Sequence, residues 1–164
     1  MDRKLDLPDE NWRHWFAGFC CAEVCFAVYP VTKDHKSYRC FWQVKVRADD
    51  DDLVYELAKI IGHGYIRYDA GRRVDRNDNA SITLRVQTQA GCQRIVDLLD
   101  GIPIRGKKAA EYKVWSTAVK SWATKTEPGC KRDWTQLASW GQELRKMKLY
   151  KATPRCLAHL SQST

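Results

Sequence analysis

The spacing of apolar residues changes from a helical to a strand period near the start of the chain. Trp12, Phe16 and Cys20 recur at helical spacing after residues 8–10, which read Pro-Asp-Glu. Proline and acidic side chains are favoured in the first turn of a helix. From residue 23 to residue 31 apolar residues occupy alternate positions, which is the period of a strand. The pattern therefore predicts a helix that runs directly into a strand.

The same two periods continue through the middle of the chain. Strands are predicted at 37–47, 65–68 and 81–87, and helices at 49–61 and 90–99. Each strand has one apolar face, so we expect helices to cover that face of an antiparallel sheet while the other face stays polar. The order predicts an α+β fold. The inward face of the longest strand is expected to carry Tyr38, Cys40, Trp42, Val44 and Val46.

The last third of the chain is predicted to be helical. The expected elements are a helix over 105–124, a turn at 127–129, a helix over 134–144 and a short segment after Pro154. The length of the chain suits one domain, residues 1–164. We expect its core over about residues 8–125 and a basic helical extension over about residues 126–164.

The charge of the chain is unevenly distributed. The sequence has 164 residues, with 28 Lys and Arg against 20 Asp and Glu, a formal charge of +8. Residues 101–164 contain 13 of the basic residues and four of the acidic ones. Such a basic flank predicts a polyanionic partner, most commonly nucleic acid, and we expect this region to hold phosphates. The composition, 44% hydrophobic and 29% charged, excludes a disordered tail and a membrane protein.

The cysteines and the N-terminus indicate the compartment. Seven cysteines are present, an odd number without paired Cys-x-x-Cys spacing, which favours reduced thiols used as small hydrophobic residues. The first ten residues are too acidic for a signal peptide. We therefore expect an intracellular protein, in an organelle such as a chloroplast or mitochondrion or in a prokaryotic cytoplasm, and not a secreted one.

One acidic residue stands out as a candidate for chemistry. Glu23 follows an almost wholly apolar run, where the predicted helix ends and the strand begins. Taken alone, it is most simply a surface residue at a helix end. The acids at 49–52 are expected to stabilise a helix N-terminus rather than to bind metal.

The residues around Glu23 form a longer pattern. Residues 16–24, FAGFCCAEV, resemble the LAGLIDADG motif of homing endonucleases, with an acid at its eighth place. The resemblance extends, in the family's order, to 41–44 (FWQV), 61–67 (IGHGYIR) and 102–108 (IPIRGKK). It covers roughly residues 8–122, and the order is more specific than any single motif.

This resemblance implies an αββαββα fold with a saddle-like sheet and one motif per chain. Chains of this type, encoded in group I introns, act as homodimers on long, near-palindromic DNA sites. The small residues Ala17, Gly18 and Cys21 would then lie in the dimer interface. Glu23 and the backbone carbonyl of Ala22 would bind Mg²⁺ for phosphodiester hydrolysis, because a divalent cation neutralises facing carboxylates.

The resemblance also assigns the basic residues. Arg105 or Lys107 would stabilise charge on the scissile phosphate. The outward strand face would bind double-stranded DNA, where Arg67 and Arg85 could each pair with guanine and Gln43 with adenine. The expected DNA-binding residues are Tyr29, Arg39, Gln43, Lys45, Arg67, Thr83 and Arg85.

Three positions depart from the family pattern and leave alternatives open. Cys21 and Val24 replace the usual Asp and Gly of the motif, and Val46 stands where some relatives carry a polar residue. The same fold could therefore serve a noncatalytic nucleic-acid binder, such as an RNA maturase or a repressor. A module that binds RNA through aromatic and basic residues is the third possibility.

Overall fold

The computed structural model describes residues 7–71, 79–124 and 132–148. The turn expected at 127–129 and the segment after Pro154 lie outside these ranges. The elements are α1 (Glu10–Glu23), β1 (Val24–Pro30), β2 (Tyr38–Arg47), η1 (Ala48–Asp50), α2 (Asp51–Ile61), β3 (Tyr65–Asp69), β4 (Ser81–Val86), α3 (Gln89–Leu99), α4 (Lys107–Ala123) and α5 (Thr135–Lys148).

The predicted α+β order is confirmed, with small changes at the boundaries. Glu23 belongs to the last turn of α1, and β1 begins at the next residue. The helix expected from residue 49 begins as the short 3₁₀ turn η1. The helix expected from residue 105 begins at Lys107, because Gly106 has φ +65° and so cannot be part of the helix.

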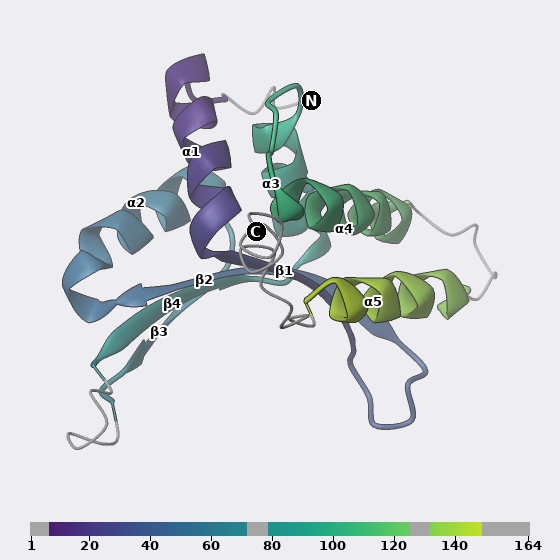
Figure 1. The fold of residues 1–164 in the computed structure, drawn as a ribbon. Coiled ribbons are helices and arrows are strands. Elements are labelled where there is room, and N and C mark those ends of the chain that lie inside the picture. Colours follow the sequence, from purple (N-terminus) through teal and green to yellow (C-terminus); the bar gives the residue numbers. More distant parts are fainter. Residues whose placement is uncertain (1–6, 72–78, 125–131, 149–164) are drawn as a thin grey trace, which may run out of the picture.

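The four strands form one antiparallel sheet in the order β1-β2-β4-β3. The register places Val24 opposite Val44, Val44 opposite Leu84, and Leu84 opposite Ile66. One apolar row therefore crosses all four strands on the side of the helices. Figure 1 shows α1 to α4 above this face of the curved sheet, while the opposite face is open.

Large aromatic side chains fill the layer between the helices and the sheet. Phe16 of α1 lies 6.0 Å from Trp42 of β2, and Phe26 of β1 lies 5.0 Å from Trp115 of α4, as measured between ring centroids. All four side chains are fully buried. Burial of each such side chain contributes roughly 1.5–3 kcal/mol. Val46, expected in this core, is only partly buried near the end of its strand.

Helix α1 is fixed at its start by polar contacts. The side chain of Asp9 accepts a hydrogen bond from the backbone N–H of Trp12 at 3.0 Å and so caps the helix. Arg13 donates from Nε to the carbonyl of Leu98 at 2.9 Å, and from Nη2 to the carbonyl of Asp100. A cation thus satisfies carbonyls at the end of α3 and holds the two helices together.

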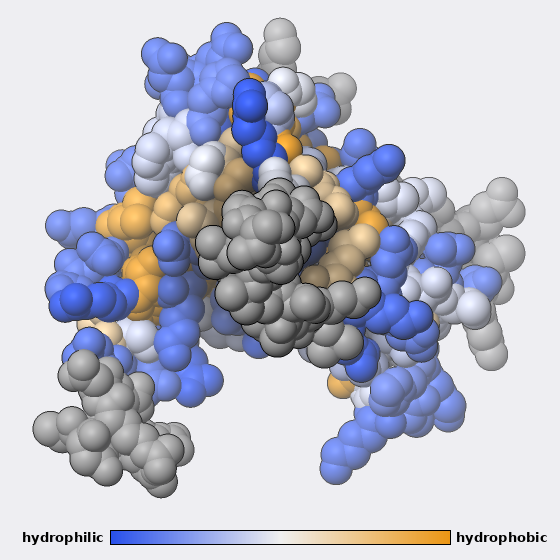
Figure 2. All heavy atoms as spheres, viewed as in Figure 1, coloured by the Kyte–Doolittle hydropathy of each residue, from blue (hydrophilic) through white to orange (hydrophobic). Residues whose placement is uncertain are grey.

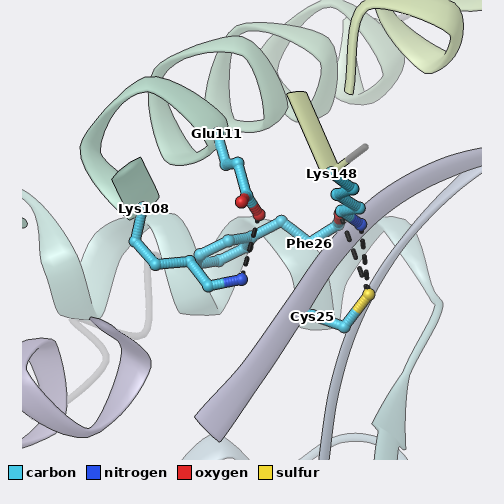
Figure 3. Close-up of polar contacts among 5 residues, drawn as sticks. All are labelled: Cys25, Phe26, Lys108, Glu111 and Lys148. Atoms are coloured by element: carbon cyan, nitrogen blue, oxygen red, sulfur yellow. Dashed lines mark hydrogen bonds and ion pairs between the residues drawn. The ribbon is translucent and has the colours of Figure 1, made fainter. Parts of the chain in front are cut away.

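Two lysines attach α4 and α5 to the region around β1 (Figure 3). Lys108 and Glu111 form a largely buried ion pair at 3.0 Å, and the Lys108 ammonium lies 6.0 Å from the centroid of the Phe26 ring. Lys148 donates hydrogen bonds to the carbonyl of Phe26 and to Sγ of Cys25, the latter at 3.2 Å. Strand β1 is therefore held by the start of α4 and by the end of α5.

The five cysteines within the described ranges are free thiols, and three of them are buried. Burial raises the pKa of Cys20 to about 12 and that of Cys92 to about 12, and it also raises the pKa of Cys40. These thiols stay protonated at neutral pH and pack as small hydrophobic residues, as the sequence predicted. In the same ranges, no helix is both long and apolar enough to span a membrane.

The packing of α5 on β1 generates a stability prediction. A Cβ added at Gly141 would lie 2.8 Å from the backbone carbonyl oxygen of Val28. We expect Gly141→Ala to lower the free energy of unfolding by about 1–3 kcal/mol, because overpacking outweighs the gain in helix propensity. Chemical denaturation measures the change. Gln142→Ala is the matched control on an exposed position of α5; equal stability of the two variants would contradict the prediction.

Candidate nucleic-acid interface

The open face of the sheet brings most of the expected DNA-binding residues together. Two rows run across β2, β4 and β3: Gln43 pairs with Arg85 and Arg85 with Tyr65, while Lys45 pairs with Thr83 and Thr83 with Arg67. A hollow on this face is lined by Gln43, Lys45, Tyr65, Arg67, Asp69, Thr83 and Arg85. We call it the sheet hollow; it contains five of the seven residues expected from the sequence.

Two residues of the sheet hollow were not expected to bind DNA. Tyr65 and Asp69 alternate with Arg67 along β3, so the strand period places all three on one face. Asp69 lies 3.8 Å from Arg67, and its carboxylate accepts a hydrogen bond from the backbone N–H of Gly71 at 3.3 Å. The alternation of Tyr65, Arg67 and Asp69 along the sequence could therefore have identified Tyr65 and Asp69 as neighbours of Arg67 on the open face.

The other two expected DNA-binding residues lie outside the sheet hollow. Tyr29 and Arg39 pair across β1 and β2, close to the turn that joins these strands. The hydroxyl of Tyr29 donates to Oε1 of Gln87 at 3.1 Å, and its ring lies 5.2 Å from that of Phe41 in an edge contact. Hydrophilic residues predominate at the turn between β1 and β2, at the lower right of Figure 2.

Glu23 lies in a second hollow, which we call the carboxylate hollow. The helix α1 ends at Glu23, and its side chain is exposed. The hollow has a volume of about 660 Å³. It is lined by Phe19, Glu23, Lys45, Val46, Arg47, Asp50, Leu53, Asn79, Ala80 and Ser81. Lys45 lines both hollows, so the two adjoin at this residue.

The cations in the carboxylate hollow differ from those expected. Arg47 is engaged by Asp49, with Nε donating to Oδ1 at 3.1 Å and Nη2 donating to Oδ2 at 2.7 Å. Lys45 forms no ion pair with any residue in the described parts of the chain. Arg105 and Lys107 are exposed before and at the start of α4, and neither lines this hollow. Among the described residues of the single chain, the unpaired cation in the carboxylate hollow is therefore Lys45, and not Arg105 or Lys107.

Glu23 offers the carboxylate chemistry that a magnesium ion requires, although no cluster of ligands surrounds it among the described residues. Across the described ranges, no group of three or more His, Cys, Asp or Glu side chains is close enough to hold a metal ion. Mg²⁺ usually takes only one or two carboxylates and completes its shell with waters and phosphate oxygens. Glu23 meets that requirement, and the carbonyl of Ala22 belongs to the last turn of α1, where carbonyls lack helical partners.

Small residues occupy part of the exposed side of α1. Gly18 is exposed, and a Cβ added there would meet no heavy atom within 4 Å. Cys21 is partly exposed and Ala22 is exposed. Ala17, expected with them, is only 2% exposed and packs in the core of the single chain. In the first half of the same helix the large side chain of Trp15 is 44% exposed. Small exposed side chains are therefore confined to the end of α1 next to Glu23.

Comparison with known proteins places these features in a family. The family model of the LAGLIDADG endonucleases matches residues 16–119, while none of the curated protein sequences compared with this chain matches it. The homing endonuclease I-CvuI, solved in complex with the I-CreI target, has a TM-score of 0.63 and 20% identity over 94% of this chain and 98% of that chain.

Two further structures match the chain over part of their own length. The LAGLIDADG homing endonuclease I-LtrWI, bound to target DNA, has a TM-score of 0.61 and 19% identity over 84% of this chain and 46% of that chain. The LAGLIDADG meganuclease I-AabMI, bound to uncleaved DNA, has a TM-score of 0.54 and 25% identity over 66% and 35%. The chain thus spans less than half of these two proteins. With the family model matching well over half of its residues, the chain belongs to the LAGLIDADG homing endonuclease family.

Proposed function

We propose that this chain is one subunit of a homodimeric, Mg²⁺-dependent, intron-encoded endonuclease that makes site-specific double-strand breaks in DNA. The observation that carries the proposal is the position of Lys45, which lines the sheet hollow and the carboxylate hollow together. A surface that reads DNA and an acid that can hold a metal ion are therefore adjacent in one chain.

The sheet hollow supports duplex DNA as the ligand. It combines cations, an amide and a hydroxyl on a surface of three strands, β2, β4 and β3. Base edges in the major groove are read by such donors and acceptors. I-AabMI, I-LtrWI and I-CvuI were each solved with DNA. Two such surfaces related by a twofold axis, each covering about one helical turn, would read a near-palindromic site of roughly 20 base pairs.

The surface of α1 supports pairing of two chains. The exposed side of α1 next to Glu23 carries small residues, namely Gly18, Cys21 and Ala22. A second α1 helix can therefore approach closely at this end. Each chain supplies one Glu23, and twofold pairing would bring two of these carboxylates to the DNA. The match to 98% of I-CvuI but to 46% of I-LtrWI is compatible with a chain that forms half of an active unit.

The residues of the carboxylate hollow have separable roles in this reaction. Glu23 would bind Mg²⁺ with the carbonyl of Ala22, and the bound ion supplies water activation and charge neutralisation at the phosphate. Lys45 would bind the scissile phosphate as a positively charged donor, next to the bases read by the sheet hollow. Arg105 and Lys107 remain proposed phosphate ligands, which would reach the DNA from the start of α4.

The role of Glu23 is tested by its isosteric amide. We expect Glu23→Gln to slow cleavage by at least about a hundredfold, because several kcal/mol of metal-derived charge stabilisation are lost. Single-turnover cleavage with Mg²⁺, on sites selected from a randomised duplex library, measures the rate. Glu143→Gln, the same change at an exposed position of α5, should cleave like the parent. A parent protein that binds these sites and never cleaves them would establish a noncatalytic binder instead.

Three substitutions to methionine test which cation binds the scissile phosphate. We expect Lys45→Met to lower the single-turnover rate at saturating DNA on the order of a hundredfold, since it removes a preorganised charge at the phosphate. Arg105→Met and Lys107→Met should lower this rate less, because neither side chain lines the carboxylate hollow. The reverse ranking of rates would return the catalytic role to the start of α4.

The pairing of α1 helices is tested at Gly18. In the single chain the added methyl group of Gly18→Ala meets no atom within 4 Å. We therefore expect the free energy of unfolding to be unchanged or higher by up to about 1 kcal/mol. The dimer should dissociate at a higher protein concentration, because the methyl group separates the two helices. Sedimentation equilibrium with and without DNA measures this. A variant that dimerises like the parent would exclude this face as the interface.

A further inference from the structure

Arg85 is held against aromatic rings on the open face of the sheet. Its Cζ atom lies 4.0 Å from the centroid of the Phe41 ring and 5.4 Å from that of Tyr29. The two rings contact each other edge to face at 5.2 Å, and the hydroxyl of Tyr29 is anchored on Gln87. We call Tyr29 and Phe41 the aromatic platform. Because β1 and β2 each contribute one ring, the platform is part of the rigid sheet.

The guanidinium on this platform has no acceptor among the residues that the structure describes. Nε of Arg85 is buried and unpaired, and no described residue forms a hydrogen bond or an ion pair with this side chain. Asp69 is the one carboxylate among the described residues that line the sheet hollow, and it is engaged by Arg67 and by the backbone N–H of Gly71. Donors in partly buried positions are normally paired. Because no described acceptor engages the guanidinium, its less buried Nη1 and Nη2 donors are free for an acceptor that arrives with a ligand.

Arg67 differs from Arg85 in every one of these respects. Its side chain is 68% exposed, it already has a carboxylate partner, and none of the aromatic rings described in the structure lies under it. An exposed arginine without a ring beneath it loses more conformational freedom on binding than one that is already stacked. The sequence treated the two arginines as equivalent, whereas the structure separates them.

We propose that Arg85 is the specificity-determining arginine of the sheet hollow and reads a guanine, with Phe41 as its positioning residue. This rests on the duplex DNA binding proposed above. Since Nε is buried, Nη1 and Nη2 are the donors left for O6 and N7 of guanine, the acceptor pair that a planar guanidinium matches. Arg67, tethered to Asp69 and exposed, binds the DNA backbone and adds affinity without selecting a base.

The test compares base preferences of full-length variants. The parent, Arg85→Lys, Phe41→Leu and Arg67→Lys are each bound to a randomised duplex library with Ca²⁺ in place of Mg²⁺, and the bound sites are sequenced. Arg85→Lys keeps the charge but loses the bidentate fork, so guanine preference should fall roughly 5- to 150-fold at one position of each half-site. Phe41→Leu should weaken the preference at that same position and at no other. Arg67→Lys should leave all base preferences unchanged.

The outcomes separate this inference from the function on which it rests. If Arg85→Lys and Phe41→Leu lower affinity equally for all sequences, Arg85 contacts phosphate and the inference is overturned, while DNA binding stands. A guanine preference lost in Arg67→Lys instead would overturn it as well. If the parent binds no duplex, the proposed function fails, and the inference fails with it. Thermal melting identifies a Phe41→Leu variant that is unfolded, in which case Arg85→Lys decides alone.

Discussion

The direct passage of α1 into β1 is the constraint on which the rest of the structure depends. No loop separates the helix, which ends at Glu23, from the strand, which begins at Val24. Cys20 before this point and Val24 after it are both buried, so the backbone on either side of Glu23 is fixed by the core. An exposed carboxylate is thereby held at the boundary between the helical layer and the sheet, and no described residue forms an ion pair that would compete with a ligand for its charge.

The same core decides which side chains face a ligand. The apolar row Val24, Val44 and Leu84 faces the helices. Its neighbour on each strand must point to the open face, because side chains alternate along a strand. Gln43 and Arg85 face outward for this reason, and a slip of one residue in the register would exchange core and ligand surface. Fold stability and the composition of the sheet hollow are thus set by one register.

The sequence predicted elements and faces well, because both depend on local periodicity. It did not predict that Lys45 joins two hollows or that Arg85 stacks on Phe41, since both contacts depend on neighbours in other strands. The resemblance pointed to Arg105 or Lys107 as the cation at the phosphate, but it could not show that neither side chain lines the carboxylate hollow of the single chain. Ala17 was grouped with the exposed small residues because residue size alone does not say which side of a helix meets the core.

The excess of basic residues in the last third has a structural component that the sequence did not reveal. Lys108 is paired with Glu111, Lys148 donates to the carbonyl of Phe26, and Arg132 donates to the carbonyls of Trp122 and Thr124. These cations hold helices and the adjoining segments in place, so they cannot all be counted as a phosphate-binding surface. Lys45 and Arg85, in the nearly neutral first part of the chain, have no ion-pair partner among the described residues. The affinity of a polyanion therefore depends on which cations are left without an internal partner, and their net number is a poor guide to where it binds.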